Sequence, residues 1–334
     1  MPRTRLVSQW SAVTVTSPAS AWAFEGSDSG RPSAYQLSGS TWKKRAFPGS
    51  SDEEIFSATA SSASNVWAFT NTGAAVQFNG SRWSVVKTFP GGISSGRAIS
   101  KTDVWVFGGY DRPAWHYNGS RWTQSASGEG LNGASALSPS SIWAYSMSGV
   151  AHWNGRTWKK TSLIKLVPKT PLGEPFVAGV YARSARSVYA LGSEGGETVG
   201  GPLVLLQYNG TSWHRAVISK EAGGPVAIIP DGTGGLWIPV NIFILDGRMD
   251  RFVHGALATA RLPISSAHLR LVGAAIAPHS TAAFAVGYER KSPSGVKRSL
   301  SVLMRSRSGP GRLADLSRWM ADRPAARAPR TSIS

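Results

Sequence analysis

Polar side chains that could do chemistry lie in loops of this 334-residue chain rather than in its apolar segments. They are Tyr110, Asp111, Arg112, Glu194, Glu197, Tyr288 and Arg290. Charges of both signs beside glycine suit oriented hydrogen bonds to a polar ligand. Two of the carboxylates could also act as general acid and base, as in glycosidases. No spacing brings such a pair together, so we predict ligand-binding residues and assign no catalytic residue.

Residue types disfavour several other kinds of site. The chain has no Cys, which excludes disulfides, thiolate nucleophiles and thiolate metal ligands. His116 and His152 occupy a repeat position that Gln fills in other copies, which indicates a hydrogen-bonding role rather than metal binding. No glycine-rich phosphate-binding motif precedes a helix, and no serine nucleophile elbow occurs. We therefore expect no metal site and no cofactor.

The elements that would position these residues form an internal repeat. A short apolar segment with an aromatic residue recurs with a mean spacing of about 44 residues. The key aromatics are Trp22, Trp67, Trp105, Trp143, Tyr189, Trp237 and Phe284. Each copy begins with a further apolar segment and a short polar turn, so each unit supplies a pair of strands before its second half.

A second hairpin signal follows the aromatic segment. It occupies residues 37–42, 78–83, 117–122, 153–158 and 208–213, and four of these copies contain Asn-Gly. Asn-Gly between apolar residues favours a tight turn, because both residues tolerate positive φ. The sixth copy retains only Asp246-Gly247, with Asp250 in place of the Trp, and the seventh copy lacks the motif.

Four short strands in about 44 residues is the content of one propeller blade. Strands that are apolar on both faces fit sheets covered by neighbours, and the repeated Trp residues would fill the space between blades. We expect an all-β fold, a seven-bladed β-propeller with four-stranded blades, over residues 1–310. A short, disordered, basic C-terminal tail would follow at 311–334, with a short helix around Leu313–Met320. Because the seventh unit lacks a clear fourth strand, we expect the N-terminal strand to close the last blade.

The best single copy is Lys101-Thr102-Asp103-Val104-Trp105-Val106-Phe107-Gly108-Gly109, followed by Tyr117 and Trp122. This pattern resembles kelch-like propeller repeats and, more closely, the Trp-rich propellers of exported actinobacterial proteins. The resemblance covers about residues 10–305 and implies a binding role without catalytic residues. It also implies an extracellular or cell-surface location. Residues 1–10 lack the apolar stretch of a signal peptide, so a cytoplasmic location is the alternative.

The formal net charge of +18 favours acidic partners. An anionic cell-surface polymer is therefore one expected partner, and a basic surface without a specific partner is the alternative. No specific nucleic-acid motif occurs, and no apolar run is long enough to span a membrane.

We interpret the chain as a non-catalytic module that recognises a carbohydrate or protein ligand through its variable loops. In a propeller, the loops between strands two and three open on the same face as the links between units, and such loops commonly carry function. A hydrolase or lyase with its active site at the mouth of the central channel is the alternative.

Overall fold

The computed structural model describes residues 9–26, 31–38, 41–51, 53–125, 128–167, 169, 171, 173–194, 201–242, 247–260, 269–290, 297–305 and 315–321. Side chains are described within these ranges except at Gln9, Lys220, Ala260 and all positions from 289 onward. The described residues contain one short 3-10 turn, η1 (Ile164–Leu166), and are otherwise strands and loops. They form no helix of the length and apolarity needed to cross a membrane.

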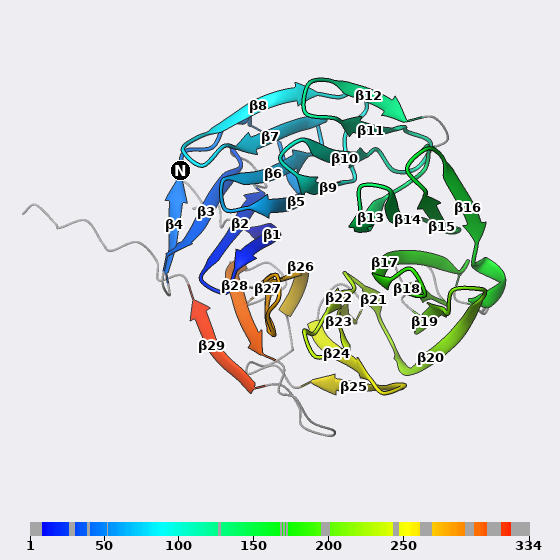
Figure 1. Ribbon diagram of the computed structural model, residues 1–334. Coiled ribbons are helices and arrows are strands. Elements are labelled where there is room, and N and C mark those ends of the chain that lie inside the picture. Colours follow the sequence, from blue (N-terminus) through cyan, green and yellow to red (C-terminus); the bar gives the residue numbers. More distant parts are fainter. Residues whose placement is uncertain are drawn as a thin grey trace, which may run out of the picture.

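Most strands belong to six four-stranded antiparallel sheets, each made from consecutive chain segments (Figure 1). The first sheet contains β1 (Gln9–Ser17), β2 (Ser20–Gly26), β3 (Ser33–Ser38) and β4 (Thr41–Arg45), and the second contains β5 (Ile55–Ser62), β6 (Asn65–Thr70), β7 (Ala74–Phe78) and β8 (Trp83–Thr88). The third contains β9 (Ser95–Ser100), β10 (Asp103–Phe107), β11 (Ala114–Tyr117) and β12 (Trp122–Ser125), and the fourth contains β13 (Gly133–Ser138), β14 (Ser141–Ser146), β15 (Gly149–Trp153) and β16 (Trp158–Ser162). The fifth contains β17 (Phe176–Ser184), β18 (Ser187–Ser193), β19 (Pro202–Tyr208) and β20 (Trp213–Ala222), and the last contains β26 (Leu269–Ile276), β27 (Ala282–Arg290), β28 (Lys297–Arg305) and β29 (Asp315–Ala321).

The remaining sheet has five strands and departs from the repeat. It contains β21 (Gly224–Pro225), β22 (Ile229–Pro230), β23 (Leu236–Asn241), β24 (Gly247–Val253) and β25 (Ala256–Ala260), and both short strands pair with β23. Proline cannot donate a ladder hydrogen bond, so Pro225 and Pro230 interrupt the inner strand. The expectation of a seven-bladed propeller with four-stranded blades is therefore wrong: the structure has six such blades, and the β21–β25 sheet, hereafter the divergent sheet, is built differently.

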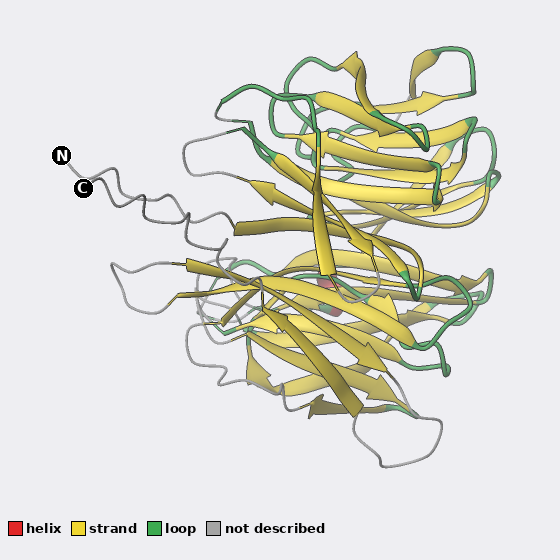
Figure 2. Ribbon diagram, turned by 90° about the vertical axis from the view of Figure 1, so that its left-hand side faces the viewer, coloured by secondary structure: helices red, strands yellow, loops and turns green. Residues whose placement is uncertain are grey.

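The sheets stand around a central axis, with the first strand of each sheet innermost (Figure 1). Because the strands are antiparallel, the loops gather at the two ends of the strands, as Figure 2 shows from the side. The links between sheets and the loops between second and third strands lie at one end, which we call the loop face. The first-to-second and third-to-fourth hairpins lie at the opposite end, which we call the hairpin face.

Neighbouring blades are joined by pairs of Trp residues, as the repeat predicts. The Trp of the second strand packs edge-on against the Trp of the fourth strand in the next blade. The ring centroids are 5.0 Å apart for Trp22–Trp83, 5.9 Å for Trp67–Trp122, 5.4 Å for Trp105–Trp158 and 5.9 Å for Trp143–Trp213. These second-strand Trp residues are buried, and each ring removes apolar surface from water at both sheets.

The Asn-Gly hairpins form as expected, with a contribution from the Asn side chain. In β7–β8, the Oδ1 atom of Asn79 accepts hydrogen bonds from the backbone amides of Ser81 (3.0 Å) and Arg82 (3.1 Å), while Gly80 has φ +100°. The turn expected at Asp246-Gly247 in the sixth copy does not hold, because Gly247 is the first residue of strand β24. Its turn is formed by His254 and Gly255, which both have positive φ.

The structure bears on the expectations about both chain ends. β1 pairs with β2 as the inner strand of the first sheet, and most of the segment expected to close the last blade falls in residues 1–8, which lie outside the described residues. The last blade takes its fourth strand from residues Asp315–Ala321, which pair with β28 instead of forming a helix. The tail from 322 onward lies outside the described residues. The ring closes by side-chain packing, in which Trp10 and Val13 lie in one buried cluster with Phe284.

Candidate functional site

A cavity of about 390 Å³ lies on the loop face where several inner strands begin. Its lining comes from the third, fourth, fifth and divergent sheets: Ser94, Tyr110, Asn132, Tyr145, Met147, Phe176, Val177, Ala178, Gly224, Pro225 and Val226. Since these residues begin inner strands or belong to adjoining loops, the cavity is the mouth of the central channel. We call it the axial mouth.

Hydrogen bonds between sheets hold the axial mouth in shape. The hydroxyls of Ser94 and Ser95 donate to the backbone carbonyl of Asn132, at 3.1 and 2.7 Å. The Asn132 amide donates to the Tyr145 carbonyl at 2.8 Å, and the Val177 amide donates to the Met147 carbonyl at 2.9 Å. The third, fourth and fifth sheets are thereby tied together at this face, so the cavity exists before any ligand binds.

Tyr110 stands at the rim of this cavity with 69% of its surface exposed. Its φ of +46° is in the left-handed region, which costs a residue with a Cβ about 1–2 kcal/mol. The loop is held in this form because the Gly109 amide donates to the Leu131 carbonyl and the Arg112 amide donates to the Gly109 carbonyl, both at 2.9 Å. An exposed aromatic ring on a strained but anchored backbone is a feature typical of binding sites.

Tyr145 supplies a hydrogen-bond donor inside the cavity. Burial raises the pKa of its phenol to about 12, so the hydroxyl stays protonated across the physiological range. Among the described residues, no partner accepts a hydrogen bond from this hydroxyl. It can therefore donate to a carbonyl or carboxylate of a ligand.

Two further apolar side chains are exposed near the axis. Phe56 lies at a register shift in β5 and is 53% exposed. Since β5 is the innermost strand of its sheet, this exposed ring faces the channel or its mouth. β-bulges commonly redirect a side chain in this way. Met147, in the lining of the cavity, is 36% exposed and has the flexible thioether common at adaptable binding surfaces.

The structure does not gather the predicted ligand-binding residues into one site. Tyr110 is the one predicted residue with a described side chain that lines the axial mouth, and its neighbour Asp111 is exposed. Arg112 is half-buried, and its backbone supports the Tyr110 loop. Glu194 and Tyr288 are buried within their own sheets, at 7% and 9% exposure. Glu197 and the Arg290 side chain lie outside the described part of the chain.

Several carboxylates of the described residues have structural partners. Tyr35 donates to Glu25 at 2.7 Å, Thr72 donates to Glu53 at 2.7 Å, and Arg251 donates to Asp231 at 2.6 Å. The described lining of the axial mouth contains no carboxylate and no histidine. The described residues also bring together no group of three or more His, Asp or Glu side chains able to hold a metal ion. The lining of the axial mouth therefore supplies no acid–base pair for the hydrolase alternative.

The repeated His/Gln position has the hydrogen-bonding role inferred from the sequence. In three copies the residue faces the key Trp across the second and third strands and bonds to the residue two places before that Trp. His116 Nε2 lies 3.0 Å from Asp103 Oδ1, Gln77 Nε2 donates to Asn65 Oδ1 at 2.8 Å, and His152 Nε2 lies 3.2 Å from Ser141 Oγ. Both histidines also stack on their Trp, with centroids 4.4 Å apart.

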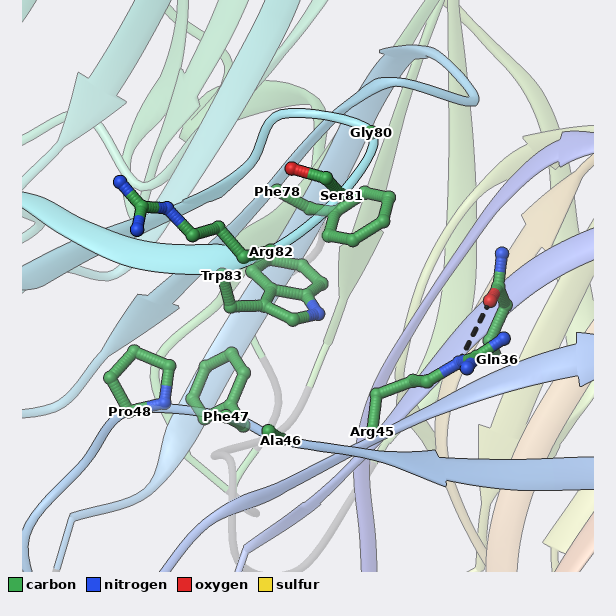
Figure 3. Close-up of a pocket in the computed structure, with 10 residues that line it drawn as sticks. All are labelled: Gln36, Arg45, Ala46, Phe47, Pro48, Phe78, Gly80, Ser81, Arg82 and Trp83. Carbon is green, nitrogen blue, oxygen red and sulfur yellow. Dashed lines mark hydrogen bonds between the residues drawn. The ribbon is translucent and has the colours of Figure 1, made fainter.

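A second cavity, of about 600 Å³, lies at the rim of the ring between the first and second sheets (Figure 3). The indole of Trp83 lies between Phe78 and Phe47, and on one side of the cavity Arg45 Nε donates to Gln36 Oε1 at 3.0 Å. The Trp83 indole nitrogen is buried without a partner.

The blade pattern explains this rim cavity. The Trp158 indole donates to Ser125, which lies three residues after Trp122 in the preceding blade. In the blade that precedes Trp83, the residue three places after Trp42 is Arg45. The Arg45 side chain has no hydrogen-bond acceptor, so it cannot accept from the Trp83 indole. The rim cavity therefore arises from a local departure from the repeat, whereas the axial mouth joins four sheets.

Sequence reasoning missed Arg97, on the inner strand β9. In five sheets the inner strand contains the same three-residue pattern: a small or apolar residue, a variable residue, and then Val or Ala. The variable residues of these five strands are Thr14, Thr59, Arg97, Ser135 and Tyr181. A comparison of this position across the repeats would have identified Arg97 as the charged exception.

Neither a known protein family nor a curated protein matches the chain in sequence. The fold is similar to that of YCF48 bound to D1 peptide, with a TM-score of 0.60 and 12% identity over 85% of this chain and 91% of that chain. YCF48 from Cyanidioschyzon merolae matches with a TM-score of 0.59 and 11% identity, over 85% and 94%. The WD40 β-propeller domain of Doa1 matches with a TM-score of 0.63 and 11% identity, over 90% and 94%. These similarities show a WD40-like β-propeller fold and do not distinguish the kelch-like or Trp-rich groups.

Proposed function

We propose that this protein is a protein-interaction module that binds a peptide segment of a partner at the axial mouth. The observation that carries the proposal is Tyr110, an exposed ring held over a preformed cavity by a strained backbone. Aromatic anchors beside a pocket are the residues that most often dominate binding energy at protein interfaces.

The lining of the axial mouth favours a peptide over a carbohydrate. Phe176, Met147 and Val226 supply apolar surface, and the Tyr145 hydroxyl can donate to a backbone carbonyl. A sugar would need several free polar side chains, whereas one of the four polar residues in the described lining, Ser94, already donates its hydroxyl to the Asn132 carbonyl. The solved structure of YCF48 bound to D1 peptide supports the proposal, because it shows that a fold of this kind can bind a peptide.

The charge of the chain indicates the kind of peptide. With a net charge of +18, the protein attracts acidic segments over long range and speeds their association. An anionic cell-surface polymer would be attracted by the same field, but it would not require the shape of the axial mouth.

Selection from a phage-displayed random peptide library, with purified full-length protein as bait, tests this function. We expect acidic peptides whose affinity falls at least tenfold in Tyr110→Asn, because Asn tolerates the left-handed backbone while the ring is lost. Leu137→Asn is the matched control, since it removes an exposed apolar side chain near the hairpin face.

Equal peptide affinity in the wild type and Tyr110→Asn, with loss of binding in Leu137→Asn, would contradict the proposed site. A glycan array probed in parallel separates the alternatives. Binding to neutral glycans, with no peptide selected, would replace the peptide proposal with the carbohydrate interpretation.

A further inference from the structure

One residue of each inner strand pairs with the key aromatic of the second strand, so these residues form a ring at one depth in the channel. The ring consists of Thr14, Thr59, Arg97, Ser135, Tyr181, Ile229 and Ala275. Arg97 is the single charged member of this ring.

Two members of the ring show what the position does elsewhere. The Thr59 hydroxyl accepts a hydrogen bond from the backbone amide of Ala98 in the next sheet, at 3.2 Å. The Ser135 hydroxyl likewise accepts from the amide of Ala182, at 3.0 Å. Each bond joins the inner strands of neighbouring blades. A guanidinium has no acceptor, so Arg97 cannot make this link.

The surroundings of Arg97 leave its charge unbalanced. Its Nε atom is buried without a hydrogen-bond partner, and no carboxylate of the described residues lies within ion-pair distance. Burial lowers the pKa of Arg97, yet arginine remains charged at physiological pH. The Arg97 side chain as a whole is half-buried, so water screens its charge only in part, and a ligand carboxylate would balance it.

Arg97 of the third sheet and Tyr181 of the fifth sheet flank Ser135 of the fourth sheet in the ring. Burial raises the pKa of the Tyr181 phenol, and the positive charges of Arg183 and Arg97 act in the opposite direction. The intervening ring residue, Ser135, is small and leaves room for the two side chains to approach. Asp231 does not neutralise Arg97, because it is bound by Arg251 and by the amides of Thr233 and Gly235.

We propose that Arg97 and Tyr181 form a carboxylate-binding subsite inside the central channel, below the axial mouth. The guanidinium matches the two oxygens of a carboxylate, and the phenol O–H adds a donor. Arg97 lies three residues along the chain from Ser94 in the mouth, a depth of about 10 Å. In its full form the inference rests on the proposed function: the carboxylate belongs to the peptide docked at the mouth, as a side chain or as the chain terminus.

The subsite is tested first without a peptide. Thermal unfolding of the full chain is measured in potassium acetate and in potassium chloride at equal ionic strength. We expect acetate to raise Tm in the wild type and in Arg121→Thr, a control that removes an exposed arginine from the β11–β12 hairpin. In Arg97→Thr the acetate effect should vanish, and in Tyr181→Phe it should shrink. An acetate effect of wild-type size in Arg97→Thr would overturn the subsite.

The Arg97→Thr variant should fold, because Thr occupies this ring position in the first and second sheets. Arg97→Gln serves as a second variant with similar length and no charge. Both should unfold in chloride at the wild-type temperature or above it, since an unpaired, half-buried charge is removed.

Peptides selected at the mouth identify the source of the carboxylate. Each peptide is compared with its C-terminal amide and with its Glu→Gln or Asp→Asn forms. The neutral form that binds the wild type at least tenfold more weakly than the parent peptide, and loses nothing further in Arg97→Thr, identifies the recognised carboxylate as the group that it lacks.

The two proposals fail separately. Peptides that need Tyr110 but bind equally to the wild type and Arg97→Thr would overturn the subsite and leave the proposed function standing. If acetate raises Tm only when Arg97 is present and no peptide is selected, the subsite would be supported and the proposed peptide-binding function would be contradicted.

Discussion

Tyr110 and Arg97 both lie on the path from the loop face into the channel, and each has an unfavourable local feature. Tyr110 is held at φ +46°, and Arg97 has a buried Nε atom without a partner. The sequence indicated Tyr110, because its loop mixes aromatic and charged residues. It did not indicate Arg97, because a lone arginine in an inner strand has no local signal and is exceptional only when the register of all sheets is compared.

The strain at Tyr110 predicts a gain in stability on substitution. Glycine adopts the left-handed region without a Cβ clash, so Tyr110→Gly should raise the free energy of unfolding by about 1 kcal/mol while abolishing peptide binding. Urea unfolding of both proteins measures this difference. A loss of stability would mean that the ring makes stabilising contacts that outweigh the backbone strain.

His152 predicts a dependence of stability on pH. Burial lowers the pKa of His152, so the native state disfavours the protonated ring that the unfolded chain accepts near its ordinary value of about 6.5. Acidification from pH 7 to pH 5 should therefore destabilise the wild type more than His152→Gln. Gln is a suitable replacement because Gln77 occupies the equivalent position in the second sheet. Urea unfolding at both pH values, with equal losses in the two proteins, would contradict this interpretation.

At the scale of elements, the repeat signals predicted the blades correctly wherever the Trp pairs and Asn-Gly hairpins were both present. They failed in the divergent sheet, where Pro225 and Pro230 split the inner strand and the outer strand β25 contains no Trp. Arg251 lies 5.4 Å from the Trp237 ring and binds Asp231. Hydrogen bonds from Thr233, Arg251 and Gly235 hold the pKa of Asp231 below its usual value although burial acts to raise it.

The Trp pairs between blades should dominate local stability. Trp105 is 1% exposed and packs on Trp158 of the next blade, so Trp105→Ala should lower the free energy of unfolding by about 3–5 kcal/mol. Arg121→Ala, an exposed change on the same sheet, should stay within about 0.5 kcal/mol of the wild type. Urea unfolding that shows similar values for both variants would refute the packing role of the pair.

At the scale of the whole molecule, the ring is completed by segments far apart in the sequence. The first and last sheets pack through Trp10 and Phe284, and β29 covers the edge of β28. The apolar spacing in 313–320 favoured a helix when taken alone. The strand forms because the exposed edge of β28 offers hydrogen bonds that a short isolated helix would not offset.

Truncation tests this closure. A chain ending at residue 314 should lose β29, expose the edge of β28 and unfold several degrees lower with a greater tendency to aggregate. A chain ending at Ala321 keeps β29 and is the matched control. Equal melting temperatures and equal solubility of the two chains would show that β29 contributes nothing to the last blade.

Hydrogen–deuterium exchange of the full chain, with and without a selected peptide, tests the location of the binding site most directly. The axial mouth predicts that bound peptide slows amide exchange in residues 108–112, 130–133, 145–148 and 224–226, where the cavity and its rim lie. Exchange in the β11–β12 hairpin on the opposite face should not change. Protection confined to residues 45–48 and 78–83 at the rim cavity, or to the hairpin face, would contradict the axial site.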